Sequence, residues 1–131
     1  MNSYNNGTPP DNISLLIFEE SLGVARSLGE LLETYGFRIA GLATCKTTAS
    51  KLVSEREFDV SVITVGRMRE EAITLAEEIL RQGRKIVFLT GYGDVEELPA
   101  RLAKHPRLDK PADPRQLAST ILSVLGYAWG S

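Results

Sequence analysis

Several features that would assign the chain to a specialised environment are missing from its sequence. There is one cysteine, Cys45, among 131 residues, so no internal disulfide can form and a reducing cytoplasm is the expected location. No apolar run approaches the roughly 18 residues that a membrane-spanning helix needs, and the N-terminus does not have the basic-then-apolar order of a secretory signal. We therefore expect a cytoplasmic domain that does not cross a membrane, in which Cys45 is a small, buried or half-buried hydrophobic residue.

The chain also lacks an excess of charge of either sign. Fifteen Lys and Arg residues against seventeen Asp and Glu residues give a net charge of −2, with both signs interspersed. A nucleic acid or an anionic membrane as the main partner would require a basic surface, so the composition argues against both. The length of 131 residues is enough for one domain with its own core.

Short apolar runs that alternate with amphipathic segments predict an α/β fold. The runs predict strands at 13–18, 37–42, 60–65, 85–90 and 107–109. Helices are predicted between Ser21 and Gly36 and over 47–57, 70–81, 94–104 and 113–125. Such a chain forms a parallel sheet through right-handed crossovers, with helices on both faces. Residues 1–12 and 126–131 are expected to be tails, the first of them disordered, that flank one domain over 13–125.

Polar side chains stand at the carboxyl ends of four predicted strands. They are Glu19 and Glu20 after the first strand, Thr64 in the third, Thr90 in the fourth and Lys110 after the fifth. In a doubly wound parallel sheet these ends meet at one edge, where ligands bind. Any one of these residues could be simply the first polar residue after a buried strand, but that reading does not explain the set.

In this order, the residues resemble the receiver domain of two-component response regulators. The segments that carry the resemblance are LLIFEES with the acidic pair, VFLTGYGD with the threonine and LDKPADP with the Lys-Pro pair. The stretch from FLTGYG onward is similar to a stand-alone receiver subgroup common in alphaproteobacteria. The resemblance spans nearly all of 13–125. It implies a flavodoxin-like (βα)5 fold with strand order 2-1-3-4-5, a switch-type hydroxyl at Thr90, the active-site lysine at Lys110 and a cis peptide bond before Pro111.

The chain departs from this family at the phosphoacceptor. The aspartate that ends the family's third strand corresponds to Thr64 in FDVSVITVGRM. Forming an acyl phosphate requires a carboxylate nucleophile and a divalent metal that offsets charge. A threonine hydroxyl is not ionised at neutral pH, and no histidine stands near Thr64 in the sequence to activate it. The expectation is a pseudo-receiver that is not phosphorylated, is not an enzyme and acts by protein contact.

The same departure weakens the expected metal site. The family's metal ligands correspond to Glu19, Glu20 and the backbone of Gly66, and Glu20 is one methylene longer than the usual aspartate. Because Mg²⁺ demands near-octahedral ligands at about 2.0–2.1 Å, we expect weak or no Mg²⁺ binding and no other cofactor. Lys110 is then expected to pair with Glu19 or Glu20 as a buried charge compensator.

The resemblance also implies the partners. They are a histidine kinase, a phosphotransferase or another response regulator, with a homodimer as a further alternative. The family's contact face is built from the fourth helix, fifth strand and fifth helix, and corresponds here to Tyr92, Asp94, Arg101, Lys104 and Arg107. Arg107 stands where family members often have a switch aromatic, so the usual aromatic readout is not expected unless Tyr92 replaces it.

Two other functions remain as alternatives. One is phosphorelay competence through a non-standard acceptor, with Thr64, Glu19 or Glu20 receiving the phosphoryl group. The other is a flavodoxin-like nucleotide-binding domain. The glycine-rich 91–93 is too short for a dinucleotide or phosphate-loop fingerprint, which spaces its glycines over six or more positions.

Overall fold

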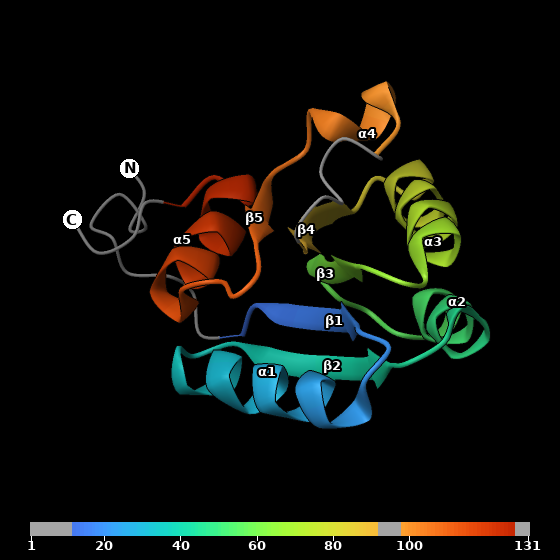
Figure 1. Cartoon of the computed structure of the whole chain (residues 1–131). Coiled ribbons are helices and arrows are strands. Elements are labelled where there is room, and N and C mark those ends of the chain that lie inside the picture. Colours follow the sequence, from blue (N-terminus) through green and yellow to red (C-terminus); the bar gives the residue numbers. More distant parts are fainter. Residues whose placement is uncertain (1–11, 92–97, 128–131) are drawn as a thin grey trace.

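The computed structural model describes residues 12–91 and 98–127, which form an α/β fold around one parallel sheet (Figure 1). The strands are β1 (Ser14–Phe18), β2 (Arg38–Ala43), β3 (Val60–Val65), β4 (Lys85–Thr90) and β5 (Arg107–Asp109). The helices are α1 (Leu22–Thr34), α2 (Lys46–Glu55), α3 (Arg69–Arg81), α4 (Ala100–Ala103) and α5 (Pro114–Val124). The strand order is β2-β1-β3-β4-β5, all pairs parallel, so the predicted flavodoxin-like fold and strand order are confirmed.

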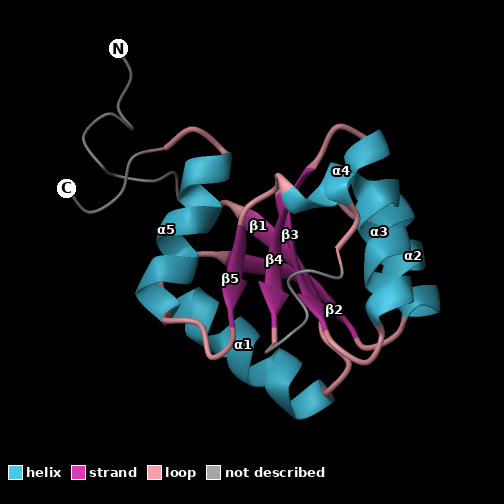
Figure 2. Ribbon diagram, turned by 45° about the horizontal axis from the view of Figure 1, so that its top comes forward, coloured by secondary structure: helices cyan, strands magenta, loops and turns pink. Residues whose placement is uncertain are grey.

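The helices cover the two faces of the sheet in separate groups. Figure 2 shows α1 and α5 on one side of the sheet and α2, α3 and α4 on the other. Because successive side chains of a strand point to opposite faces, β1 serves both cores. Leu15 and Ile17 belong to the core under α1 and α5, whereas Leu16 and Phe18 belong to the core under α2 and α3.

The predicted helix ends follow from their local sequence. The hydroxyl of Ser21 accepts a hydrogen bond from the backbone N–H of Val24 at 3.3 Å, which caps the start of α1. Gly36, just beyond the end of this helix, has φ of +95°, a conformation that favours glycine. At α5 the carboxylate of Asp113 accepts from Arg115 N at 2.9 Å, and Pro114 opens the first turn.

The apolar pattern of α1 is only partly buried. Ala25 and Leu32 are buried against the sheet, together with Gly29. Leu22 is 49% exposed and Leu31 is 37% exposed, although both continue the apolar spacing. A helix that packs on a sheet covers only one stripe, so the apolar residues beside that stripe depend on a neighbouring helix for cover.

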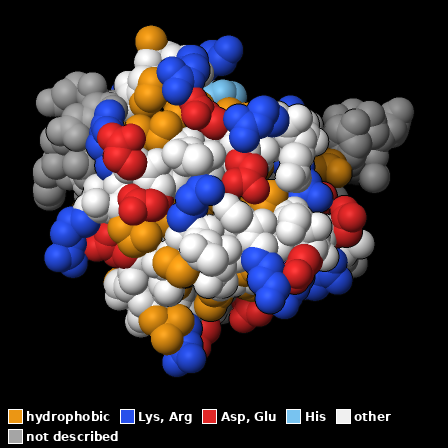
Figure 3. Space-filling view, turned by 90° about the vertical axis from the view of Figure 1, so that its right-hand side faces the viewer, with side chains coloured by type: hydrophobic (Ala, Val, Ile, Leu, Met, Phe, Trp, Pro, Cys, Tyr) orange, Lys and Arg blue, Asp and Glu red, His pale blue; other side chains and the backbone are white. Residues whose placement is uncertain are grey.

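The surface on the side formed by α2 and α3 carries intermixed acidic and basic side chains (Figure 3). Within 12–91 and 98–127, no helix has both the length and the apolar character needed to cross a membrane. Tyr127, assigned to the tail by the sequence, packs against the core under α1 and α5.

Cys45 is exposed, so the expectation of a buried or half-buried residue is wrong. The reason is that Cys45 precedes α2 and does not belong to the buried face of this helix, which is formed by Ala49 and Val53. Its sulfur lies 3.3 Å from the hydroxyl oxygen of Thr48. This hydrogen bond lowers the pKa of the Cys45 thiol, and backbone N–H groups at the start of α2 add to the effect.

We therefore predict that Cys45 reacts with iodoacetamide in the native state and at a lower pH than an ordinary thiol, because the thiolate is the nucleophile. Removing the hydroxyl by Thr48→Val should raise the pKa of Cys45 toward its ordinary value and shift the midpoint of the rate-against-pH profile upward. Thr47→Val is the matched control and should leave the midpoint in place. Labelling that requires denaturant would contradict the prediction.

Candidate functional site

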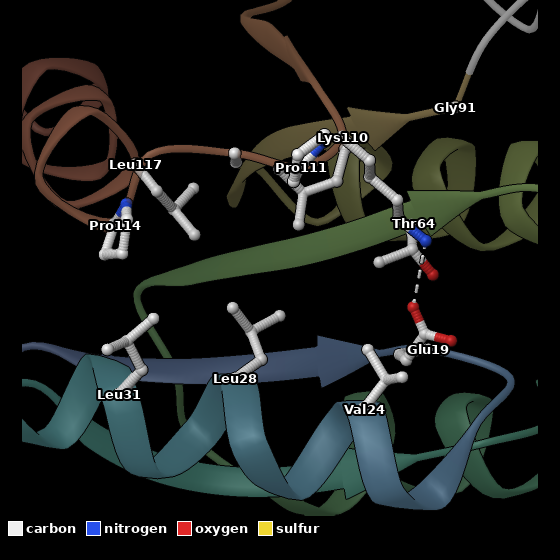
Figure 4. Close-up of a pocket in the computed structure, with 12 residues that line it drawn as sticks. Glu19, Val24, Leu28, Leu31, Thr64, Gly91, Lys110, Pro111, Pro114 and Leu117 are labelled. Atoms are coloured by element: carbon white, nitrogen blue, oxygen red, sulfur yellow. Dashed lines mark hydrogen bonds and ion pairs between the residues drawn. The ribbon is translucent and has the colours of Figure 1, made fainter.

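The carboxyl edge of the sheet brings four of the predicted residues into one pocket. Glu19 follows β1, Thr64 lies in β3, and Lys110 and Pro111 follow β5; all four line a cavity of about 500 Å³ (Figure 4). Glu19 and Thr64 share this side of the sheet because each lies an even number of residues from strand positions that face α1 and α5, such as Ile17 and Val62.

Glu19 and Lys110 form an ion pair at the centre of this edge. Lys110 Nζ lies 3.2 Å from Glu19 Oε1; the Glu19 side chain is 4% exposed and that of Lys110 39%. The second oxygen of Glu19 accepts from the backbone N–H of Ser21 at 2.8 Å. The structure therefore selects Glu19, of the two acids, as the partner of Lys110, and both carboxylate oxygens are satisfied. The Lys110–Pro111 peptide bond is cis.

The hydroxyl of Thr64 has a structural partner. It donates to the backbone carbonyl of Phe18 in β1 at 3.0 Å, within the buried interior. Ser61, three residues earlier in β3, makes the same kind of bond to the carbonyl of Leu16 at 2.9 Å. An ionised carboxylate has no proton to donate to such a carbonyl. The side chain at residue 64 is thus suited to tie β3 to β1.

Thr90 does not join the pocket. Its buried hydroxyl donates to Asp109 Oδ1 of β5 at 3.1 Å. Along β4, Thr90 lies an even number of residues from Phe88, which belongs to the core under α3. The predicted switch-type hydroxyl is therefore engaged across the β4–β5 pair and does not line the pocket.

Glu20 has a partner that the sequence interpretation missed. Arg67 Nε lies 3.1 Å from Glu20 Oε2, with the arginine side chain 91% exposed. The signal was available in the sequence, since Arg67 and Arg69 follow directly after the third strand. The two acidic residues thus have two separate cations, Lys110 for Glu19 and Arg67 for Glu20.

The arrangement does not fit the divalent metal site implied by the resemblance. Both oxygens of Glu19 are already bonded, Glu20 is paired with Arg67 and Thr64 is neutral. Gly66 lies exposed after β3. In the part of the chain that the structure describes, no cluster of three or more His, Cys, Asp or Glu residues could hold a metal ion. A Mg²⁺ ion at this edge would have to compete with two resident cations for its carboxylates.

The predicted contact face is only partly within the described residues. Tyr92 and Asp94 lie outside them. Arg101 forms an ion pair with Glu77 of α3, Lys104 is exposed at the end of α4 and Arg107 is half-buried at the start of β5. Burial lowers the pKa of His105, and the charges of Lys104 and Lys85 add to this shift. The positive charge of this face at neutral pH therefore comes from its lysine and arginines.

The burial of Glu19 predicts unequal effects for the two ion pairs. Lys110→Met removes the cation from a buried carboxylate and should lower the free energy of unfolding by about 1–3 kcal/mol. Arg67→Ala breaks a solvent-exposed pair and should change it by at most about 1 kcal/mol. Urea unfolding of both variants measures the difference. Glu19→Gln combined with Lys110→Met should recover part of the loss, because no buried charge then remains. Equal effects of the two single substitutions would show that Lys110 is not a charge compensator.

The comparisons with known proteins agree with this geometry at the level of the fold. No model of a protein family matches the sequence, and no curated protein does either. Solved structures match over most of the chain. A response regulator receiver protein from Burkholderia phymatum is 20% identical with a TM-score of 0.76, and the match covers 91% of this chain and 99% of that one.

Two further structures extend the same result. The solution structure of SdrG from Sphingomonas melonis Fr1 is 24% identical, with a TM-score of 0.74 and coverage of 89% of this chain and 99% of that one. The receiver domain of the PhyR response regulator from Erythrobacter litoralis is 22% identical, with a TM-score of 0.74. The match covers 92% of this chain and 95% of that one. The fold of this chain is therefore the fold of response-regulator receiver domains.

Proposed function

We propose that this chain is a receiver-type domain of two-component phosphorelay signalling that acts by protein contact and is not phosphorylated. The observation that carries the proposal is the hydrogen bond from the Thr64 hydroxyl to the carbonyl of Phe18. The side chain at the phosphoacceptor position is buried, neutral and bonded to the neighbouring strand. Such a group holds the receiver scaffold together but does not attack phosphorus.

The neighbouring acids support the same conclusion. An acceptor carboxylate must have a free oxygen in line with the phosphoryl donor. Glu19 has both oxygens bonded and is almost fully buried, and Glu20 is held by Arg67. Glu19 therefore has no free oxygen, and the ion pair with Arg67 disfavours Glu20 as a substitute acceptor. In the same proposal the domain works without Mg²⁺, since Lys110 and Arg67 already neutralise the acids that would bind the ion.

We assign partner binding to the surface around α4 and β5, with a histidine kinase, a phosphotransferase or another response regulator as the partner. Support comes from the exposed Lys104 and the half-buried Arg107, which give this surface positive charge. Arg101 contributes while also pairing with Glu77. Protein partners with an acidic contact surface fit this charge.

Phosphotransfer is tested with labelled acetyl phosphate in the presence of Mg²⁺. We expect no base-labile label on the wild-type chain, because residue 64 is not a carboxylate, Glu19 has no free oxygen and Glu20 is paired with Arg67. Thr64→Asp combined with Arg67→Ala restores an acid and frees Glu20, so any label it gains shows that the assay detects an acyl phosphate at this site. Base-labile label on the wild type would overturn the proposal. Phosphothreonine at residue 64, detected by mass spectrometry of protein from its host, would favour the alternative acceptor.

The contact surface is tested by charge reversal. Lys104→Glu should weaken capture of the partner by about tenfold, because a like charge then faces the acidic surface. Lys51→Glu reverses a lysine on α2 that is also exposed and is the matched control, with expected binding near that of the wild type. Binding is measured against the histidine kinases, phosphotransferases and response regulators of the host, each purified singly. Equal binding by the two variants would exclude Lys104 from the contact.

A further inference from the structure

An apolar groove runs between α1 and α5 and opens beside the Glu19–Lys110 pair. In Figure 4, Val24, Leu28 and Leu31 stand in a row along α1, and Pro114 and Leu117 face them from the start of α5. The cavity measures about 500 Å³. Small-molecule sites typically have about 300–1,000 Å³, apolar walls and a few polar groups at one end. The groove meets this description in size and in chemistry.

The apolar wall on α1 is unusually open to solvent. Val24, Leu28 and Leu31 recur at the spacing of four and three residues that places them on one stripe of a helix. Val24 is 49% exposed and Leu31 is 37% exposed, and with Leu22 they are the large hydrophobic residues that stand exposed within the described part of the chain. Exposed apolar side chains that gather in a concavity, rather than singly, are typical of a binding site.

At the polar end of the groove, the side chain with hydrogen-bond donors to spare is Lys110. Both oxygens of Glu19 accept bonds, and the hydroxyl proton of Thr64 is donated to Phe18. Lys110 carries three N–H donors. Among the described residues its ammonium has one acceptor, Glu19, while its side chain is 39% exposed. What this end offers to an incoming molecule is therefore a cationic donor.

We propose that the groove binds a small amphiphile, a monocarboxylate with an apolar chain, whose carboxylate accepts a hydrogen bond from Lys110 Nζ. The apolar chain of this ligand lies between α1 and α5 against Val24, Leu31 and Leu117. An apolar cavity of about 150 Å³ accommodates benzene, so an open groove of this size takes a chain of roughly ten carbons. The proposal goes beyond the signalling role and holds whether or not Thr64 accepts a phosphoryl group.

Binding to Lys110 does not require the buried pair to break. An ammonium can donate to Glu19 and to a second carboxylate at the same time, because its three donors point in different directions. The carboxylate of Glu19 is shielded by its bonds to Lys110 and to the N–H of Ser21. A ligand with an apolar chain of the same length but a neutral head group would make the apolar contacts and lose the charge-assisted hydrogen bond.

The test titrates the full chain with decanoate below its micelle concentration and follows backbone amide shifts by NMR. Saturable shifts confined to α1 and to the segment from Lys110 to α5 are expected. Decanol is the probe without the charged head and should bind at least about tenfold more weakly, because a charged acceptor is lost. Equal binding of decanoate and decanol, or no saturable shift with decanoate, would overturn the proposal.

A matched pair of variants separates the groove from the rest of α1. Val24→Glu places a carboxylate at the polar end of the groove and should weaken decanoate binding about tenfold. It should not unfold the helix, since a glutamate three residues after the Ser21 cap suits that position. Leu22→Glu alters a residue of the same helix that is equally exposed and does not line the groove, and should bind as the wild type does.

Two further results decide between the amphiphile and other occupants. In the double variant Glu19→Gln with Lys110→Met, the preference for decanoate over decanol should disappear, because the cation is gone and no buried acid is left unpaired. Sedimentation of the wild type and of Val24→Glu shows whether the groove is instead covered by a second copy. A dimer that Val24→Glu dissociates and that decanoate leaves intact would overturn the proposal.

Discussion

The ion pair between Glu19 and Lys110 is the constraint on which the carboxyl edge of this sheet depends. A carboxylate that is almost fully buried is tolerated only when its charge is compensated and its oxygens are bonded. Here the compensating cation comes from a residue 91 positions later in the chain. The end of β1 is thereby joined to the end of β5, and the second oxygen of Glu19 fixes the start of α1 through Ser21. The backbone N–H of Lys110 also donates to the carbonyl of Thr90 at 2.7 Å, so one residue connects three strands.

Next to this ion pair, neutral hydroxyl groups form hydrogen bonds at a position where the family has a charged carboxylate. In the family that the sequence resembles, an aspartate would stand at residue 64, next to the acidic pair. Thr64 and Ser61 instead donate to two carbonyls of β1 from within the interior. A hydroxyl needs no counter-ion when it is buried, whereas a third carboxylate would need a metal or another cation. At this edge Lys110 and Arg67 balance the charges of Glu19 and Glu20, and the buried hydroxyls of β3 bond this strand to β1.

The exposure of apolar side chains on α1 and the exposure of Cys45 share one origin. Helical periodicity identified α1, but it gave no means of deciding which of its apolar residues are covered. That depends on how far α5 lies from α1, and the groove between them leaves Val24 and Leu31 exposed. The expectation that Cys45 is buried rests on the usual behaviour of free cysteines and takes no account of its position before a helix. Its exposure is a consequence of where α2 begins.

Local sequence patterns are enough to predict the helices and strands, their alternation and the edge of the sheet at which the polar residues gather. These follow from local patterns, because apolar runs define strands and parallel crossovers bring all carboxyl ends to one side. Which side chains meet at this edge becomes known from the folded chain alone. Lys110 forms an ion pair with Glu19 rather than with Glu20, Glu20 forms an ion pair with Arg67, and the hydroxyl of Thr90 donates a hydrogen bond to Asp109. The physical reason is that each partner depends on strand register and on the face to which the pleat turns a side chain, and residues far apart in the chain carry no local signal of either.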